Sequence, residues 1–297
     1  MPQETAITIR QPATANLMID SADRDDSYPT CFDFQIVKPA SIMNGFFSRV
    51  GTTEVVLEWC EHNITESDTY KNNAIVFDLS MNSPSQPAPI TTTIDLSGGF
   101  YTVAETLDAI VAKLNDLSGT TTMTFAIVKV GGYVKLEATG GSFSIPIAGQ
   151  LNAGSILANQ LQIVQESLVT FRQISCPDLR PFRYIDFVSQ QLTYNQDLKD
   201  ATSNNIVRDV LCRWYFDDDV PEQLDTYGFA ILMGYKQFCR RRLFNPPKQI
   251  RWSNNMPVGN ISFQLYGWVP YVGLGLQPIE SDGEDTNWLM TLQMSEN

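Results

Sequence analysis

Two stretches near the start of the chain alternate apolar and polar side chains, which is the period of a β-strand with one buried face. They are Phe32–Ile36 and Arg49–Trp59. A strand-like Leu-Met-Ile and then the acidic run Asp20–Asp26 precede the first of them. Short polar side chains bond to their own backbone and therefore interrupt regular structure at such a run. We expect a polar N-terminal arm, residues 1–30, that leads into a strand-rich body.

The second half of the chain returns to the strand pattern. Aromatic and β-branched residues, which favour strands, dominate six segments from Glu166 onward. The polar connection over residues 193–203 is too long for a tight hairpin and is typical of a surface loop. The six segments are Glu166–Ile174, Tyr184–Leu192, Asn205–Phe216, Gln249–Trp252, Asn260–Val269 and Trp288–Met294.

A capping box marks the clearest helix. Thr102 suits the N-cap position and Glu105 follows three residues later, so each side chain can accept the other residue's backbone N–H. Apolar residues recur at helical spacing from Val103 to Leu114, which predicts a helix of about a dozen residues that packs on a sheet.

Strand candidates flank this helix on both sides. Ala74–Leu79 and Thr91–Leu96 precede it. Met123–Val130 and Tyr133–Ala138 follow it and form a hairpin across a Gly-Gly pair, which tolerates the positive φ of a two-residue turn.

These patterns predict an all-β fold, a single jelly-roll β-sandwich with an inserted α+β subdomain. About eight strands outside the middle unit, joined by long loops with scarcely any helix, suit a jelly roll. The jelly roll takes residues 31–61 and 166–297, and the inserted subdomain takes residues 62–165.

The charge balance argues against a nucleic-acid partner. Among 297 residues, 33 are acidic and 20 basic, and the net charge of −13 repels phosphate. No apolar run is long enough to span a membrane, and the threonine-rich N-terminus does not read as a signal peptide. Five widely spaced cysteines without a Cys-x-x-Cys pair favour reduced thiols over disulfides or a zinc site.

The sequence offers little catalytic chemistry. Its one histidine, His62, rules out triads of histidine metal ligands. Carboxylate pairs such as Asp23 with Asp25, or Glu222 with Asp225, occur in any acidic β-protein, and glycosidases need two that face each other across a cleft. The acidic run at the start of the chain lacks the glycine and distal glutamate of an EF-hand, so a solvated turn is the simpler interpretation. We expect no catalytic, cofactor-binding or metal-binding residue, no cofactor, and no enzyme activity.

Three phrases of the sequence resemble minor capsid proteins, specifically the penton-type jelly-roll proteins of virophages and Polinton-like double-stranded DNA viruses. The resemblance runs over most of the chain in order and implies a single jelly roll with an inserted subdomain. It also implies that five copies close each icosahedral vertex, with trimeric major capsid protein as the neighbour. The phrases are residues 19–24 followed by Phe32–Phe34, Ile94–Thr102 entering a helix, and Tyr184–Ser189 before Asn205–Val207.

The function that follows from this resemblance is that of a structural virion protein, a penton subunit in a homopentameric ring. Its partners would be further copies of itself and the major capsid protein of the same virus, without direct nucleic-acid binding. Its location would be the capsid of the virion, assembled in the infected host cell. Another minor capsid role stays open as an alternative.

A closed ring joins different patches head to tail, so we expect an acidic and a basic patch on opposite flanks. The alternative interpretation of the run Arg240–Arg242 is a solvated loop, or an interface that meets acidic residues such as Asp217–Asp219. The interface candidates are Asp217, Asp218 and Asp219 on one flank and Arg240, Arg241 and Arg242 on the other.

Two rival functions come from other classes. The first is a jelly-roll carbohydrate-binding or host-attachment module, in which Trp252, Trp268 and Tyr271 stack on sugar rings, although core packing explains such aromatics more simply. The second is a hydrolase on a β-sandwich. The sequence disfavours it because no set of polar residues typical of a hydrolase active site is recognisable.

Overall fold

A computed structural model describes most of the chain, and every structural statement below refers to that part. The described residues are 14–37, 47–67, 69–82, 89–117, 122–131, 133–146, 153–163, 171–174, 177–193, 210–216, 223–251, 259–270, 274–281 and 286–296.

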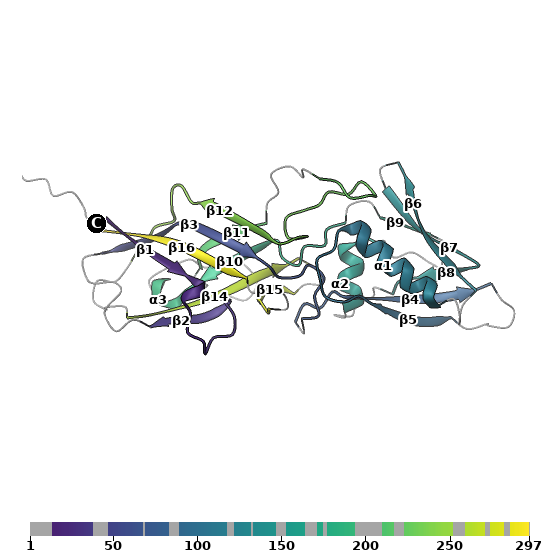
Figure 1. Ribbon diagram of the computed structural model, residues 1–297, viewed down its shortest axis with the longest axis horizontal. Coiled ribbons are helices and arrows are strands. Elements are labelled where there is room, and N and C mark those ends of the chain that lie inside the picture. The colour runs from purple at the N-terminus through teal and green to yellow at the C-terminus, as the bar shows by residue number, and fades with distance from the viewer. Residues whose placement is uncertain are drawn as a thin grey trace, which may run out of the picture.

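Two antiparallel sheets form one lobe, on the left in Figure 1. Sheet A has the order β1-β16-β3-β12, with β13 also paired to β3, and sheet B has the order β11-β10-β14-β15, with β2 also paired to β14. Sheet A contains β1 (Thr14–Asp20), β3 (Arg49–Trp59), β12 (Phe238–Leu243), β13 (Ile250–Arg251) and β16 (Asn287–Ser295). Sheet B contains β2 (Asp33–Val37), β10 (Tyr184–Val188), β11 (Val210–Tyr215), β14 (Asn260–Val269) and β15 (Gly275–Pro278).

The order of these strands identifies the fold. Without the short β13 and β15, eight described strands remain, and numbered along the chain they lie as 1-8-3-6 in sheet A and 2-7-4-5 in sheet B. This is the order of two Greek keys wrapped into a jelly roll. The predicted fold class, all-β with a single jelly roll and an α+β insertion, is confirmed.

Tryptophan and phenylalanine rings fill the space between the two sheets. Trp288 on β16 is 1% exposed and lies within 5.5 Å, centroid to centroid, of the rings of Phe34, Phe187 and Phe263. Its indole Nε1 donates a hydrogen bond to the backbone oxygen of Cys31 at 3.0 Å. A buried indole N–H usually has such a partner, and here the bond favours one orientation of the ring.

The second lobe lies end to end with the sandwich, on the right in Figure 1, and has its own hydrophobic core. It holds two three-stranded sheets, β5-β4-β8 and β6-β7-β9, with helices α1 and α2. Its elements are β4 (Ala74–Met81), β5 (Ile90–Asp95), α1 (Val103–Asp116), β6 (Thr124–Val130), β7 (Tyr133–Thr139), β8 (Gly141–Ser144), α2 (Ala153–Gln160) and β9 (Phe171–Ile174). Because all of them lie between β3 and β10 in the chain, we call this lobe the insert.

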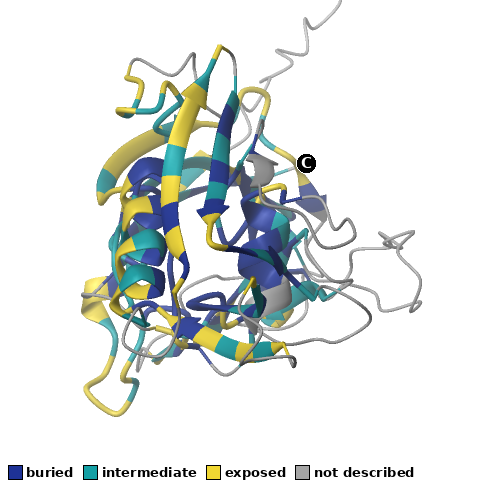
Figure 2. Cartoon of the chain, turned by 90° about the vertical axis from the view of Figure 1, so that its right-hand side faces the viewer, coloured by how far each residue is buried: buried dark blue, intermediate teal, exposed yellow. Residues whose placement is uncertain are grey.

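Helix α1 begins where the capping box predicted. The Thr102 hydroxyl accepts the Glu105 N–H at 3.2 Å, and the Glu105 carboxylate accepts the Thr102 N–H at 2.8 Å. Leu107, Ile110 and Leu114 face the core of the insert. Figure 2 looks onto this lobe and shows α1 buried along one side and exposed along the other.

The predicted hairpin is also present. β6 and β7 pair from Thr124 with Thr139 to Val130 with Tyr133. Gly131 in the turn has φ of +57°, a conformation that costs glycine little and most other residues more.

Glu105 makes the insert sensitive to acid. Its hydrogen bonds from Thr102 lower the pKa of this carboxyl from its ordinary value. Because the unfolded chain then binds the proton more tightly, the stabilisation is complete above pH about 4.3 and is lost as the pH falls through the folded pKa. We expect Glu105→Gln to flatten that part of the acid unfolding curve followed by far-UV circular dichroism. An unchanged curve would contradict the role of this carboxylate.

Two of the predicted boundaries need correction. Residues 14–20 are not part of an arm, because they form β1 and pair with β16 from Thr14 with Ser295 to Asp20 with Leu289. Residues 171–174 belong to the insert, because β9 pairs with β7. In both cases the pairing partner is distant in sequence, so no local pattern showed where the strand belongs.

Other corrections concern element type. The strand expected over Tyr184–Leu192 ends at Val188, and Gln190–Thr193 form the short helix α3. There the Thr193 hydroxyl donates to the Ser189 oxygen at 2.7 Å, a local bond that competes with strand pairing. Helix α2 was not predicted, and neither was β12, whose three arginines hide the strand pattern.

Candidate assembly surfaces

The three candidate arginines lie on β12, the strand next to β3 in sheet A, rather than in a loop. Arg241 is paired on the outer side of the sheet with Glu54, with Nη2 to Oε2 at 3.0 Å, and this bond raises the pKa of Arg241. The Arg242 guanidinium lies over the Trp214 ring of sheet B, 5.1 Å from its centroid. The side chain of Arg240 is exposed. Arg241 and Arg242 therefore already contact residues of their own chain.

The acidic candidates Asp217, Asp218 and Asp219 lie outside the described residues. Phe216, the last described residue before them, contacts Phe238 of the arginine strand, with ring centroids 5.9 Å apart. This contact does not favour the expectation that the acidic and basic runs occupy opposite flanks.

The outer side of sheet B carries an aromatic ladder around an ion pair. Asp186 on β10 is fully buried and accepts two hydrogen bonds from Arg213, at 2.6 and 2.9 Å. The Arg213 guanidinium lies 3.8 Å from the centroid of the Tyr184 ring, and Tyr184 stacks on Trp268 at 5.8 Å and 16°. Tyr215 is next to Tyr184, with centroids 5.6 Å apart. We call these five residues the aromatic face.

The aromatic face is rigid and electrostatically organised. The hydrogen bond with Asp186 raises the pKa of Arg213, so this guanidinium stays charged. The Arg213 guanidinium lies over the face of the Tyr184 ring, and the Trp268 ring is stacked parallel to that of Tyr184. The faces of the Tyr184 and Trp268 rings are therefore turned toward each other across neighbouring strands. Tyr215 is 42% exposed, whereas Tyr184 and Trp268 are only partly exposed. Its ring is therefore the most accessible of the three.

The outer side of sheet A has a different character. Cross-strand partners share one side of a sheet, and the register places Met18, Thr291, Glu54 and Leu243 in one row across β1, β16, β3 and β12. Met18 is 65% and Leu243 63% exposed. Asp20 and Glu58 lie in neighbouring rows on the same side. We call Met18, Asp20, Glu54, Glu58 and Leu243 the acidic face.

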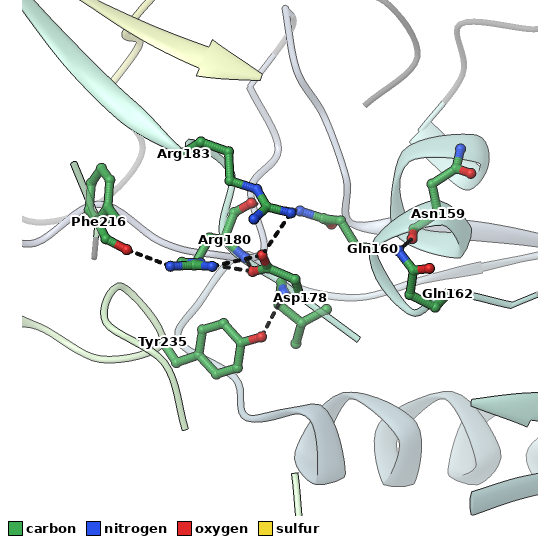
Figure 3. A network of polar contacts seen from close by, with 9 residues as sticks. Asn159, Gln160, Gln162, Asp178, Arg180, Arg183, Phe216 and Tyr235 are labelled. Carbon is green, nitrogen blue, oxygen red and sulfur yellow. Dashed lines mark hydrogen bonds and ion pairs between the residues drawn. The ribbon is translucent and has the colours of Figure 1, made fainter. Parts of the chain in front are cut away.

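A polar network joins the two lobes (Figure 3). Asp178 accepts hydrogen bonds from Arg180, with Nη2 to Oδ2 at 3.0 Å, and forms an ion pair with Arg183 at 3.2 Å. Arg180 also donates to the Phe216 oxygen at the end of β11. On the insert side, the Asp178 N–H donates to the oxygen of Gln160 in α2 at 2.7 Å. The side chains of this joint therefore connect α2 of the insert with the sandwich.

The segment between β11 and β12 strengthens the same joint. Its Asp225 accepts the Ala104 N–H at the first turn of α1, at 2.9 Å, together with the N–H groups of Tyr227 and Phe229. Tyr235 is 1% exposed, and its hydroxyl accepts the Leu179 N–H at 2.7 Å. A segment that belongs to the jelly roll by sequence thus packs on the insert.

The remaining candidates from the sequence have local roles. Asp20 and Asp25 accept backbone N–H groups of Ala22 and Ser27 in their own turn, each at 2.9 Å. His62 lies against Phe100, with ring centroids 5.3 Å apart. Within the described residues no group of three His, Cys, Asp or Glu side chains is placed to hold a metal ion. No helix of the described part is long and apolar enough to cross a membrane.

Of the three aromatic residues proposed for sugar stacking, one lies in the described part of the chain. Trp252 and Tyr271 lie outside it. Trp268 is described, and its ring is stacked on Tyr184. The aromatic face itself was not predicted, although Tyr184 and Trp268 occupy outward positions of strands whose alternate residues are core, which was a usable signal.

The strand order and the position of the insert define the class, a single jelly roll that carries an α+β lobe between its third and fourth strands. Among solved structures, the chain is similar to the mavirus penton protein, at 12% identity and a TM-score of 0.52, covering 97% of this chain and 100% of that one. A chain of the Sputnik virophage structure also matches, at 11% identity and a TM-score of 0.48, over 96% of this chain and 98% of that one. No model of a known protein family matches, and no curated protein sequence does. The chain has the penton-type jelly-roll fold.

Proposed function

We propose that this protein is a structural capsid subunit, a penton that forms a homopentameric ring at the five-fold vertices of an icosahedral virion. The observation that carries the proposal is the match to the mavirus penton protein along both complete chains, with the insert in place. A likeness that covered the sandwich alone would be shared by many unrelated jelly rolls.

The chemistry of the described residues agrees with a structural role. Three carboxylates of the described residues are buried, and each has a structural partner: Asp186 bonds to Arg213, Asp178 to Arg180, and Glu61 accepts a hydrogen bond from Thr286. Burial raises the pKa of Cys212 to about 12, which keeps that thiol protonated and unreactive. In this proposal the protein has no catalytic function, and its partners are copies of itself and the major capsid protein of the same virus.

The oligomeric state tests the proposal directly. We expect the purified full-length chain to form five-membered rings, seen by negative-stain imaging and by native mass measurement over a range of concentrations and with added major capsid protein. A chain that stays monomeric under all of these conditions, or that closes rings of another size, would sink the penton assignment.

The arginine strand gives a second, narrower test. We expect the pair Arg240→Glu and Arg241→Glu to lower the fraction of chains in rings, because a basic edge next to an acidic neighbour becomes repulsive. Arg242 is left unchanged, because it packs on Trp214. The matched control is the pair Lys71→Glu and Lys129→Glu, which makes the same change in net charge at exposed positions of the insert region. Equal ring fractions in the two variants would remove these arginines from the interface.

The division of the chain into domains is also a proposal. The two separate hydrophobic cores support a jelly-roll domain and an inserted domain. We propose the corrected boundaries: the jelly roll begins with β1, and the insert includes β9.

A further inference from the structure

The aromatic face and the acidic face lie on the outer sides of the two sheets, and therefore on opposite flanks of the sandwich. A ring that closes by rotation needs two different surfaces placed in this way, one for each neighbour. The flanks proposed above from the two charge runs are a rival contact, because Arg241 lies on the same side of sheet A as the acidic face and the two contacts predict opposite effects of Arg241→Glu.

We propose that the aromatic face of one copy binds the acidic face of a second copy of this chain. This inference rests on the proposed ring and names its subunit contact. The described residues of the two faces are Tyr184, Asp186, Arg213, Tyr215 and Trp268 on one side, and Met18, Asp20, Glu54, Glu58 and Leu243 on the other.

The side chains of the aromatic face suit a protein partner. Tyrosine, tryptophan and arginine are the residues that most often dominate the binding energy of interfaces. Here the guanidinium is fixed by two hydrogen bonds to Asp186 and by the Tyr184 ring, and Tyr184 is stacked on Trp268. Side chains that are already ordered lose little entropy on binding, so this surface is prepared for contact.

The charges of the two faces are complementary. In the ion pair, the Asp186 side chain is 1% exposed and that of Arg213 is 32% exposed, so a partner meets the positive member. The edges of aromatic rings also carry partial positive charge, which adds to that field. The acidic face has three carboxylates, Asp20, Glu54 and Glu58. On the same side of the sheet, Arg241 is paired with Glu54, and Arg49 lies at the far end of β3.

The apolar parts of the acidic face also need a partner. Met18 and Leu243 are among the largest exposed apolar side chains of the described residues, and they end the same row of sheet A. Covering them with tyrosine and tryptophan rings removes apolar surface from water. Contact between two aromatic faces would instead give a two-fold dimer and would bring like charges together.

A change of charge at one position on each face tests the contact. We expect Tyr215→Glu to raise the protein concentration needed for half-assembly about tenfold or more, as for an interface hot spot, and Tyr215→Arg to preserve assembly. Glu58→Arg alone weakens assembly, and the double variant with Tyr215→Glu restores it, because each joint then has one charge of each sign. Val128→Glu on β6 of the insert, at a position of similar exposure, is the control and leaves assembly unchanged.

Thiol cross-linking identifies the faces that meet. Cys239 is exposed on the same side of sheet A as Glu58, its cross-strand neighbour. In Tyr215→Cys, a short bis-maleimide should therefore produce a ladder of linked chains beyond the dimer, and this ladder should be lost when Cys239→Ser is added. A product limited to dimers that survives Cys239→Ser would indicate contact between two aromatic faces and overturn the proposal.

The outcomes separate the two proposals. If the wild-type chain forms rings and Tyr215→Glu forms them equally well, the contact proposed here is wrong and the penton assignment stands. If the wild-type chain forms no oligomer, both fall. Circular dichroism of each variant shows that it is folded, so that a loss of rings reports the interface.

Discussion

Gly267→Ala is expected to be among the most destabilising single-atom additions in the sandwich, by about 3 kcal/mol, the upper part of the range for overpacked cores. Gly267 lies on β14 opposite Ile185, and a Cβ atom there would overlap the ring atoms of Phe182. That ring cannot move aside, since it is 1% exposed and packs against Trp59 and Tyr70, with centroids 6.2 and 4.9 Å away. Denaturant unfolding followed by tryptophan fluorescence measures the effect, because all five tryptophans lie outside residues 62–165.

A matched control and a rescue make this prediction specific. Gly98→Ala adds the same methyl group where the nearest neighbour, His62 Nδ1, lies at 3.4 Å. Far-UV circular dichroism, which also reports the insert, should show a change in stability of less than about 1 kcal/mol. Combining Gly267→Ala with Phe182→Leu should cost clearly less than the sum of the single changes, because leucine vacates part of the overlapped space. Additive costs would show that the ring is not the obstacle.

Trp288→Ala should lower the free energy of unfolding of the sandwich by about 3–5 kcal/mol, the usual cost of deleting a buried aromatic ring. The indole contacts Phe34, Phe187 and Phe263 and donates to the Cys31 oxygen, so its loss leaves a cavity and an unpaired acceptor. Trp288→Phe keeps much of the ring and should cost less. Far-UV circular dichroism in denaturant measures both variants, and equal costs for the two would mean that cavity size does not decide the loss.

Local patterns in the sequence predicted the central strands and the best helix. Asn260–Val269 alternates core and surface residues along its whole length, Arg49–Trp59 does so from Val55 onward, and both strands have the predicted bounds in the structure. Helix α1 was predicted because Thr102 and Glu105 place both halves of a capping box within four residues. These elements carry their own signal, because the period and the caps are properties of adjacent residues.

The rest depends on partners that are distant in the sequence. The sequence marked Leu17–Ile19 of β1 as strand-like, but the extent of this strand and its place in sheet A come from pairing with β16 at the other end of the sequence. β12 carries three successive arginines and is a strand because it pairs with β3. The aromatic face needed the register as well, because Arg213, Asp186 and Tyr184 become neighbours only when β10 and β11 are aligned.

The candidate site was predicted less well than the fold. The arginine run was singled out for its charge, whereas the structure pairs Arg241 with Glu54 and packs Arg242 on Trp214. Charge runs along the sequence do not tell which charges are already matched across strands. The penton resemblance itself rested on short phrases, and the structural likeness now extends it to the whole chain at the level of fold.

The pairing of β1 with β16 also determines the order in which the two lobes can fold during synthesis. Thr14 lies opposite Ser295, so the sandwich cannot be completed until β16 has left the ribosome. The insert, in contrast, is built from consecutive elements between residues 74 and 174 and can collapse while synthesis continues. Because closing such a long loop is slow, the unpaired sheets stay exposed for a time and are prone to aggregate. In nascent chains that stop before β16, we expect the insert to resist limited proteolysis and the strands of the sandwich to be cleaved.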